Sequence, residues 1–438
     1  MIDTTKNIQL FLGDNQKILK QIPDNSIDSF VSDPPYELGF MGKIWDNTGI
    51  AYNISLWKEV LRVLKPGGHL LSFGGSRTYH RMACAIEDAG FEIRDQIMWV
   101  YGSGFPKSLN IGKAVDKAQG KEREVVGEKQ HAKKDFKDNL YAQAEANKNN
   151  ERVFGYGKEI LTKGNSDWEG WGTTLKPAHE PIVVARKPLS EKTVVENVLK
   201  WGVGGINIDD CRIPYSKNNP PIPQLAQGKT EIKTDKKMYG RNSFNESKTK
   251  SIIGGDLSGR FPANLIHDGS EEVLKIFPNS KAGKNKGEGS KSGGIWSKST
   301  GKPAGQEYGD NGSAARFFYC AKVSKSERNA GCDELEEKEE VYPGANSFNE
   351  KGDRIRKDGS IIPSLKSKNN HPTVKPIALM KYLITLISRE GQNVLDPFMG
   401  SGTAGVACKL LNRRFIGIEI SEEYLKIAQE RIKNTIKT

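Results

Sequence analysis

The tetrapeptide Asp33-Pro34-Pro35-Tyr36 combines a carboxylate, two rigid prolines and an aromatic ring directly after the apolar segment 27–31. An aromatic exocyclic amine is a poor nucleophile because its lone pair is delocalised into the ring. A carboxylate at Asp33 and the backbone carbonyl of Pro34, which proline aims by fixing φ, can accept the two N–H groups of such an amine and free that lone pair. Tyr36 offers a face on which an extruded base can stack. Methylation of a base amine by direct transfer from a nearby sulfonium donor would use each of these groups, and the plainer interpretation of Pro-Pro is a surface turn.

A second pattern, near the end of the chain, is typical of a nucleotide-binding βαβ unit. An apolar segment at 393–395 leads into Asp396, and Gly400, Gly402 and Gly405 have the spacing G-x-G-x-x-G. A helical stretch and another apolar segment follow, which ends at Glu419, where a ribose-binding acid is expected. The spacing also fits a dinucleotide-dependent oxidoreductase, and a simple tight turn is the plainest alternative.

The position of this unit in the chain argues against a dehydrogenase. Only one predicted strand, at 415–418, follows the glycine loop before the chain ends at residue 438. A doubly wound sheet needs more strands, which only the N-terminal region can supply, where predicted strands alternate with helices. The fold class that follows is α/β: a circularly permuted Rossmann-like sheet, in which the 393–395 strand lies near the strand at 28–31. The apolar segment 180–185 is predicted as a further strand, paired with that at 97–100.

Composition and the density of predicted helices and strands divide the chain into five ranges. Residues 1–107 are predicted to be the N-terminal part of a catalytic domain, and 108–171 a lysine-rich insertion. Residues 172–190 are predicted to return to the catalytic domain as a strand, and 191–365 to form a long inserted target-recognition region. Residues 366–438 are predicted to complete the catalytic domain with its cofactor-binding part.

Composition narrows the class of protein. The chain has 66 Lys and Arg against 54 Asp and Glu, a net charge of +12, which favours a polyanionic partner, although a solvated lysine surface explains it as well. The five cysteines are scattered and form no C-x-x-C pair, so we expect neither a disulfide framework nor a metal site. No apolar run is long enough for a membrane span, and a soluble, cytoplasmic protein without a membrane partner is expected.

These motifs together resemble the amino-methyltransferases of DNA that act on N6 of adenine or N4 of cytosine. The order here is the tetrapeptide at 33–36, a long variable segment, His371-Pro372-Thr373-Val374-Lys375-Pro376 and then the loop at 396–402, which is the β arrangement of that family. The resemblance covers about the first 107 and the last 70 residues, and the stretches 99–108 and 175–189 are similar to parts of phage-type modification methylases.

The resemblance implies a fold, a cofactor and site residues. The fold is the S-adenosylmethionine-dependent methyltransferase sheet, and the catalytic residues are the four of the tetrapeptide. Among the cofactor contacts, Glu419 would bind the ribose hydroxyls, Asp14 would lie near the adenine, and Thr373 and Lys375 would touch the methionine end. The full set of implied cofactor contacts is Asp14, Thr373, Lys375, Asp396, Phe398, Gly400, Gly402, Thr403 and Glu419.

The target base follows from the first residue of the tetrapeptide. Cytosine-C5 enzymes need a Pro-Cys nucleophile, and no cysteine here follows a proline. Cytosine-N4 enzymes of the family more often carry Ser in place of Asp33, so the resemblance implies N6 of adenine in double-stranded DNA, with N4 of cytosine as the alternative. A DNA-binding protein without catalysis is the other class left open, as are a homodimer and a cognate restriction enzyme as partners. Phe105 with Lys107, and Arg316 beside Phe317 to Tyr319, are candidate DNA contacts, although core packing is favoured for the second set.

Overall fold

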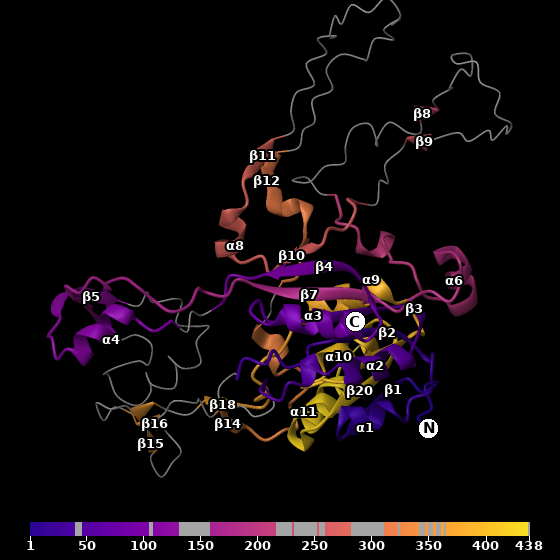
Figure 1. Cartoon of the computed structure of the whole chain (residues 1–438), viewed down its shortest axis with the longest axis horizontal. Coiled ribbons are helices and arrows are strands. Elements are labelled where there is room, and N and C mark those ends of the chain that lie inside the picture. Colours follow the sequence, from indigo (N-terminus) through magenta and orange to yellow (C-terminus); the bar gives the residue numbers. More distant parts are fainter. Residues whose placement is uncertain are drawn as a thin grey trace, which may run out of the picture. The chain divides into compact units, whose positions relative to one another are not determined.

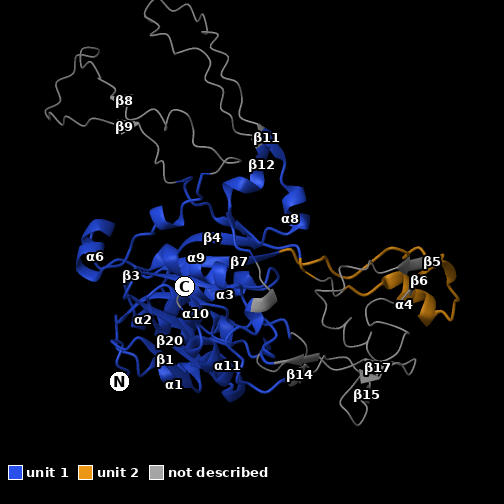
Figure 2. Cartoon of the chain, turned by 180° about the vertical axis from the view of Figure 1, so that it is seen from behind, with its two compact units in different colours: residues 1–102, 179–337, 368–438 blue, residues 103–178, 338–367 orange. Residues whose placement is uncertain are grey.

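The computed structural model describes most of the chain and divides it into two compact units, coloured separately in Figure 2. The described residues are 1–39, 46–104, 108–130, 158–215, 230–231, 252–253, 259–281, 311–322, 325–340, 347–348, 354–355, 361–362 and 365–436. The first unit comprises Met1–Gly102, His179–Glu337 and Lys368–Thr438, and the second comprises Ser103–Ala178 and Lys338–Ser367. Phe105 and Lys107 lie outside the described residues.

A mixed sheet forms the centre of the first unit (Figure 1). Every neighbouring pair in it is parallel except those made by β7, which runs antiparallel to both β3 and β4. Its strands, in spatial order, are β1 (Ile8–Leu12), β20 (Arg414–Glu419), β19 (Asn393–Asp396), β2 (Ile27–Ser32), β3 (Leu64–Phe73), β7 (His179–Arg186), β4 (Glu92–Val100), β10 (Leu265–His267) and β13 (Tyr319–Cys320).

The strand order confirms the predicted permuted α/β sheet. Counted from β19 as the first strand of the nucleotide-binding unit, β1-β20-β19-β2-β3 has the doubly wound order 3-2-1-4-5. The predicted neighbours pair directly, Val394 with Ser29 and Leu395 with Phe30. The predicted pairing of 180–185 with 97–100 is also confirmed, in antiparallel register. The topological switch point, where ligands bind in open α/β sheets, therefore lies between β19 and β2.

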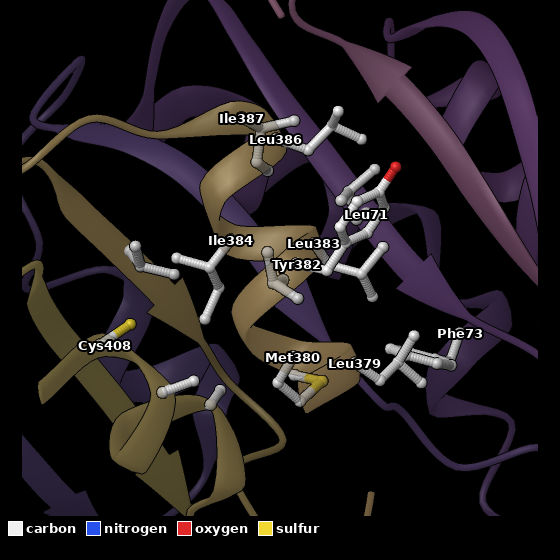
Figure 3. Packing of buried hydrophobic residues seen from close by; sticks show 14 of the residues in the cluster. Leu71, Phe73, Leu379, Met380, Tyr382, Leu383, Ile384, Leu386, Ile387 and Cys408 are labelled. Atoms are coloured by element: carbon white, nitrogen blue, oxygen red, sulfur yellow. The ribbon is translucent and has the colours of Figure 1, made fainter. Parts of the chain in front are cut away.

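Helices cover both faces of this sheet because its buried strands are apolar on both sides. Phe30 of β2 packs with α1 (Asn15–Leu19), α2 (Ile54–Val63) and α3 (Tyr79–Asp88), whereas its neighbour Val31 faces the opposite cluster. That second cluster contains α9 (Ile377–Ile387), α10 (Thr403–Leu410) and α11 (Glu422–Lys433). Figure 3 shows the side chains of α9, among them Leu379 and Leu383, packed with Leu71 and Phe73 of β3. Burying each such side chain contributes about 1.5–3 kcal/mol.

Shorter elements complete the two units. In the first unit they are α6 (Val194–Trp201), α8 (Glu271–Ile276), the strand pairs β8 (Thr230–Glu231) with β9 (Ile252–Ile253) and β11 (Asn279–Lys281) with β12 (Asn311–Ser313), and 3-10 turns at Ile50–Tyr52, Asp209–Cys211, Ala314–Phe317 and Lys325–Arg328. In the second unit they are α4 (Ile111–Ala118), β5 (Glu124–Gln130) with β6 (Lys158–Lys163), β14 (Lys338–Glu340) with β18 (Leu365–Ser367), and β15 (Ser347–Phe348), β16 (Arg354–Ile355) and β17 (Ile361–Ile362).

Strands β10 and β13 come from the range 191–365, and they extend the central sheet beyond β4. The five-range division made from the sequence, including target recognition by 191–365, stays a prediction. No helix within the described ranges is long and apolar enough to cross a membrane.

Candidate active site

The acidic residues singled out in the sequence follow strands that end at one edge of the sheet. Asp14 comes after β1, Glu419 ends β20, Asp396 ends β19 and Asp33 follows β2. Because these four strands are parallel, their carboxyl ends lie along the same edge. The antiparallel β7 begins at this edge, and it brings Glu180 to the loop after β2.

A cluster of four polar side chains lies where β2 ends. The ammonium of Lys375 is 2.7 Å from Oδ2 of Asp33 and 3.3 Å from Oε2 of Glu180. It also donates to the hydroxyl of Tyr36 at 3.2 Å, and that hydroxyl donates to Oε2 of Glu180 at 2.8 Å. The four side chains, which we call the Asp33 cluster, join residues that are far apart in the sequence through hydrogen bonds and ion pairs.

The cluster shifts the pKa values of its cation and its phenol. Burial alone would lower the pKa of Lys375, but the charges of Asp33 and Glu180 outweigh it and leave that pKa above its ordinary value. Burial, followed by the same two negative charges, raises the pKa of Tyr36 well above 10. Lys375 therefore stays a cation and Tyr36 a neutral hydroxyl throughout the physiological pH range.

One oxygen of Asp33 is left without a partner. Oδ2 is held by Lys375, whereas Oδ1 is buried and has no hydrogen-bond partner among the residues that the structure describes. A buried carboxylate oxygen without a donor is costly, on the order of 1–3 kcal/mol or more, so its retention points to a donor that comes from a ligand. An N–H of an amine at the switch point is such a donor.

The glycine loop after β19 is held by the acid that ends β20. The backbone N–H of Gly400 donates to Oε2 of Glu419 at 2.8 Å, and the N–H of Ser421 donates to Oε1 of the same carboxylate at 2.8 Å. Gly400 and Gly402 have φ of 53° and 77°, the left-handed region that favours glycine. Burial raises the pKa of Glu419, and these backbone donors offset part of that shift.

Asp396 is buried at the base of the same loop. Its Oδ1 accepts from the hydroxyl of Ser32 at 2.5 Å and from the backbone N–H of Phe398 at 3.1 Å. Burial raises the pKa of Asp396 to about 7, although both hydrogen bonds lower it. The hydrogen bond to Ser32 ties the glycine loop to the last residue of β2, immediately before Asp33.

His371 closes over the glycine loop from the segment before α9. A Cβ added to Gly400 would lie 2.7 Å from Nε2 of His371 and so could not be accommodated without movement. The His371 ring packs edge to face on Tyr424, with centroids 4.6 Å apart, and Nη2 of Arg328 donates to its backbone carbonyl at 2.8 Å. Burial and the charge of Lys375 lower the pKa of His371 to about 3, so the ring is neutral near pH 7.

Gly400→Ala should therefore disrupt the loop. The new methyl group clashes with His371, and alanine is strained in the left-handed backbone conformation of Gly400. The clash and the strain each cost about 1–3 kcal/mol. We expect ligand affinity at the loop to fall at least about tenfold, measured by isothermal titration calorimetry with S-adenosylmethionine. The matched control is Gly391→Ala, at a glycine with φ of 74° and nothing within 4 Å of the added Cβ. Equal affinities for the two variants would show that the contact with His371 is unimportant.

Other predicted cofactor residues have other partners in the structure. The Asp14 carboxylate caps α1 by accepting from the N–H of Gln16, and the Thr403 hydroxyl accepts from Nη1 of Arg431 at 3.0 Å. Thr373 is exposed, and Phe398 is half-buried. The cofactor roles of these residues, like that of Lys375, stay predictions.

Sequence reasoning missed Glu180 and gave His371 no role of its own. Glu180 lay within the segment predicted as a strand, so only its position in the sheet distinguishes it from a surface acid. Its signal was a charged residue, between His179 and Pro181, at the start of an otherwise apolar run. Among the described residues, no group of three His, Cys, Asp or Glu side chains could hold a metal ion.

The chain is similar to known DNA methylases in sequence. A family model described as DNA methylase matches residues 27–430. The type II methyltransferase M2.DpnII of Streptococcus pneumoniae is 52% identical over 76 residues, which are 17% of this chain and 28% of that protein. The DNA adenine methyltransferase YhdJ of Escherichia coli K12 is 51% identical over 63 residues, 14% of this chain and 21% of that protein. The matched segment thus spans less than a third of either relative. Among solved structures, the cytosine-N4-specific PvuII DNA methyltransferase aligns over 97% of this chain and 86% of that one, with 14% identity and a TM-score of 0.40.

Proposed function

Because this chain belongs to the family of N6 and N4 DNA methylases, whose model matches residues 27–430, we propose that it transfers the methyl group of S-adenosylmethionine to N6 of adenine in duplex DNA. The observation that carries the proposal is the Asp33 carboxylate at the switch point: Lys375 holds Oδ2, and Oδ1 is buried without a partner in the part of the chain that the structure describes. The oxidoreductase alternative offers no role for this arrangement, since hydride transfer needs no acceptor for an amine.

The chain's own residues prepare the amine for attack. Oδ1 of Asp33 accepts one N–H of the target amine and the backbone carbonyl of Pro34 accepts the other, which draws the nitrogen toward tetrahedral geometry. Pro34 and Pro35 fix the path of the backbone, so the carbonyl is aimed before the base arrives. The bound cofactor supplies an electrophilic methyl group on a sulfonium sulfur. The amine lone pair forms the new N–C bond as the C–S bond breaks, and one amine proton then leaves to solvent.

The glycine loop fits the cofactor. Gly400 and Gly402 allow the loop to turn tightly against His371 and Ala428, and the Glu419 carboxylate, fixed by two backbone N–H groups, retains lone pairs for ribose hydroxyls. Asp396 holds the base of the loop, and Phe398 is half-buried beside it. These five residues would hold the cofactor. Asp14, Thr373, Thr403 and Lys375 are further proposed contacts, of which Thr403 and Lys375 would have to share their present hydrogen bonds.

The base must leave the helix to reach Asp33. In a duplex, N6 is paired and stacked, and extruding the base costs a few kcal/mol. Stacking on the Tyr36 ring offsets part of this cost, at about 1–3 kcal/mol per base–aromatic contact. The net charge of +12 supports duplex DNA as the partner through its phosphates. A cognate restriction enzyme and a homodimer remain proposed partners; the name of one relative, a type II methyltransferase, supports the former.

Adenine is favoured over cytosine on two grounds. The resemblance associates Asp at position 33 with adenine, and the relative YhdJ is named a DNA adenine methyltransferase. The acceptor geometry suits either amine, so N4 of cytosine is the second candidate.

Product analysis tests the proposal. The purified chain is incubated with duplex DNA and S-adenosylmethionine, and the DNA is digested to nucleosides for mass spectrometry. We expect N6-methyldeoxyadenosine. N4-methyldeoxycytidine would identify the second candidate. DNA binding without any methylation would instead favour a non-catalytic protein, and NAD binding without S-adenosylmethionine binding would favour an oxidoreductase.

A further inference from the structure

We propose that Glu180 is a positioning residue for the methylation proposed above: it holds Tyr36 and Lys375 in place, so that Asp33 keeps one carboxylate oxygen for the target amine. This inference rests on the proposed function, but its structural part concerns only the Asp33 cluster.

The antiparallel strand β7 delivers Glu180 to the site. Glu180 pairs with Trp99 of β4, and the neighbouring Pro181 accepts from the backbone N–H of Gly74 at 2.9 Å, directly after β3. The strand is thereby fixed on both sides, and the Glu180 side chain is only 17% exposed. Burying a carboxylate on a central strand is costly unless it is paired or hydrogen-bonded, and the partners of Glu180 lie in the Asp33 cluster.

The first of these partners is Tyr36. Its hydroxyl donates to Glu180 at 2.8 Å, and its backbone carbonyl accepts from the Thr78 hydroxyl at 2.7 Å. The backbone of Tyr36 and the hydroxyl of its side chain are therefore each held, which positions the ring before a base stacks on it. The hydroxyl of Tyr36 thus has a role that the tetrapeptide alone does not reveal, since stacking requires only the ring.

The second partner is Lys375, whose ammonium has three hydrogen atoms to donate. In the structure they have three acceptors within 3.3 Å: Oδ2 of Asp33, the Tyr36 hydroxyl and Oε2 of Glu180. If Glu180 were absent, the freed donor could turn to the Asp33 carboxylate that Lys375 already contacts, whose Oδ1 has no partner among the described residues. That atom is the one proposed to accept the target amine. By accepting a hydrogen bond from Lys375, Glu180 therefore keeps Oδ1 of Asp33 available for the target amine.

Glu180 also faces a third side chain. Burial and the charge of Glu180 raise the pKa of Tyr101 to about 12, so this phenol too is neutral and can donate to the carboxylate. The carboxylate accepts from Tyr36 and pairs with Lys375, and it has lone pairs left for the Tyr101 hydroxyl. Its position is thus fixed from several directions, as a positioning role requires.

The test is a double-mutant cycle on Glu180→Ala and Tyr36→Phe, with Glu180→Gln as the conservative variant. Single-turnover methylation rates are measured with saturating cofactor and DNA, and cofactor affinity is measured separately by calorimetry. Glu180→Ala leaves partners unsatisfied, so we expect a rate loss of roughly ten- to hundredfold, with a change in cofactor Kd of about twofold or less. Glu180→Gln keeps an acceptor for Tyr36 and should recover part of the rate.

The cycle separates positioning from independent effects. If Glu180 acts through the Tyr36 hydroxyl, the double variant should be little slower than Glu180→Ala alone. Full activity of Glu180→Ala, fully additive losses, or a loss confined to cofactor affinity would each overturn the proposal. The matched control is Glu92→Gln, because Glu92 pairs with Arg186 at the other end of the β4–β7 pair and should leave the rate unchanged.

A spectroscopic measurement keeps the structural part testable without methylation. With 3-fluorotyrosine placed at position 36 of the full chain, the fluorine NMR resonance should shift and broaden in Glu180→Ala but not in Glu92→Gln. An unchanged resonance would show that Glu180 does not position Tyr36. If the unmodified protein methylates no DNA amine, the proposed function fails, whereas a shifted resonance would still support the contact itself.

Discussion

Asp33→Ala should reduce the single-turnover rate of DNA methylation by at least about 10²–10³-fold while S-adenosylmethionine still binds. The magnitude is that of losing one preorganised hydrogen bond that is strongest in the transition state. The carboxylate oxygen Oδ1 is buried, has no hydrogen-bond partner among the described residues, and is the atom proposed to accept one N–H of the amine. The cofactor loop is tied to β2 through Ser32 and Asp396 and not through Asp33, so the cofactor affinity should change little. Single-turnover kinetics and calorimetry measure the two quantities separately.

The matched control for this substitution is Asp209→Ala. Asp209 is an exposed carboxylate on a 3-10 turn, and it pairs with Arg212, which is not part of the Asp33 cluster. Its variant should methylate at the normal rate. Undiminished methylation by Asp33→Ala would mean that the tetrapeptide is structural, and the mechanism would fail with it.

Lys375→Met should destabilise the folded chain and abolish activity together. The ammonium lies between two carboxylates, at 2.7 Å from Asp33 and 3.3 Å from Glu180, and is 9% exposed. Removing the ammonium leaves two largely buried negative charges without compensation, which should lower the free energy of unfolding by about 3 kcal/mol. This value is at the lower end for breaking a buried ion pair, because both acids keep some contact with water. Urea unfolding measures the loss. Methylation should fall in parallel, because Asp33 loses the ion pair at Oδ2 that holds its carboxylate in place.

The pH dependence of the unmodified protein follows from the shifted pKa of this lysine. The folded-state pKa of Lys375 lies above its ordinary value, so its contribution to stability is fully present below the unfolded-state pKa and is lost only as the pH rises through the folded-state value. Near neutrality the contribution should therefore be constant.

A second ion pair provides the control for Lys375. Lys65 is 2.6 Å from Asp28, but its side chain is 26% exposed and it compensates only one carboxylate. Lys65→Met should therefore cost less stability and leave methylation intact. Equal stability of Lys375→Met and the unmodified protein would show that the lysine does not compensate the two acids.

The sequence by itself determined the permuted sheet and the chemistry of its loops. Apolar segments leading to Asp33, Asp396 and Glu419 indicated which residues follow strands, and the order of the motifs placed the nucleotide-binding unit after the strands of the N-terminal region. Both conclusions follow from local patterns, because strand periodicity and glycine spacing are properties of neighbouring residues.

Only the tertiary structure decided which side chains surround Asp33. The partners Glu180 and Lys375 come from segments about 150 and 340 residues away in the chain, and their meeting depends on strand order and on the antiparallel direction of β7. A sequence pattern can place a residue at the end of a strand, but it carries no information on which distant strand will lie beside it. Burial also leaves Oδ1 of Asp33 without a partner among the described residues, and it keeps the His371 ring, which lies against Gly400, neutral. This burial arises only when the separate segments pack together.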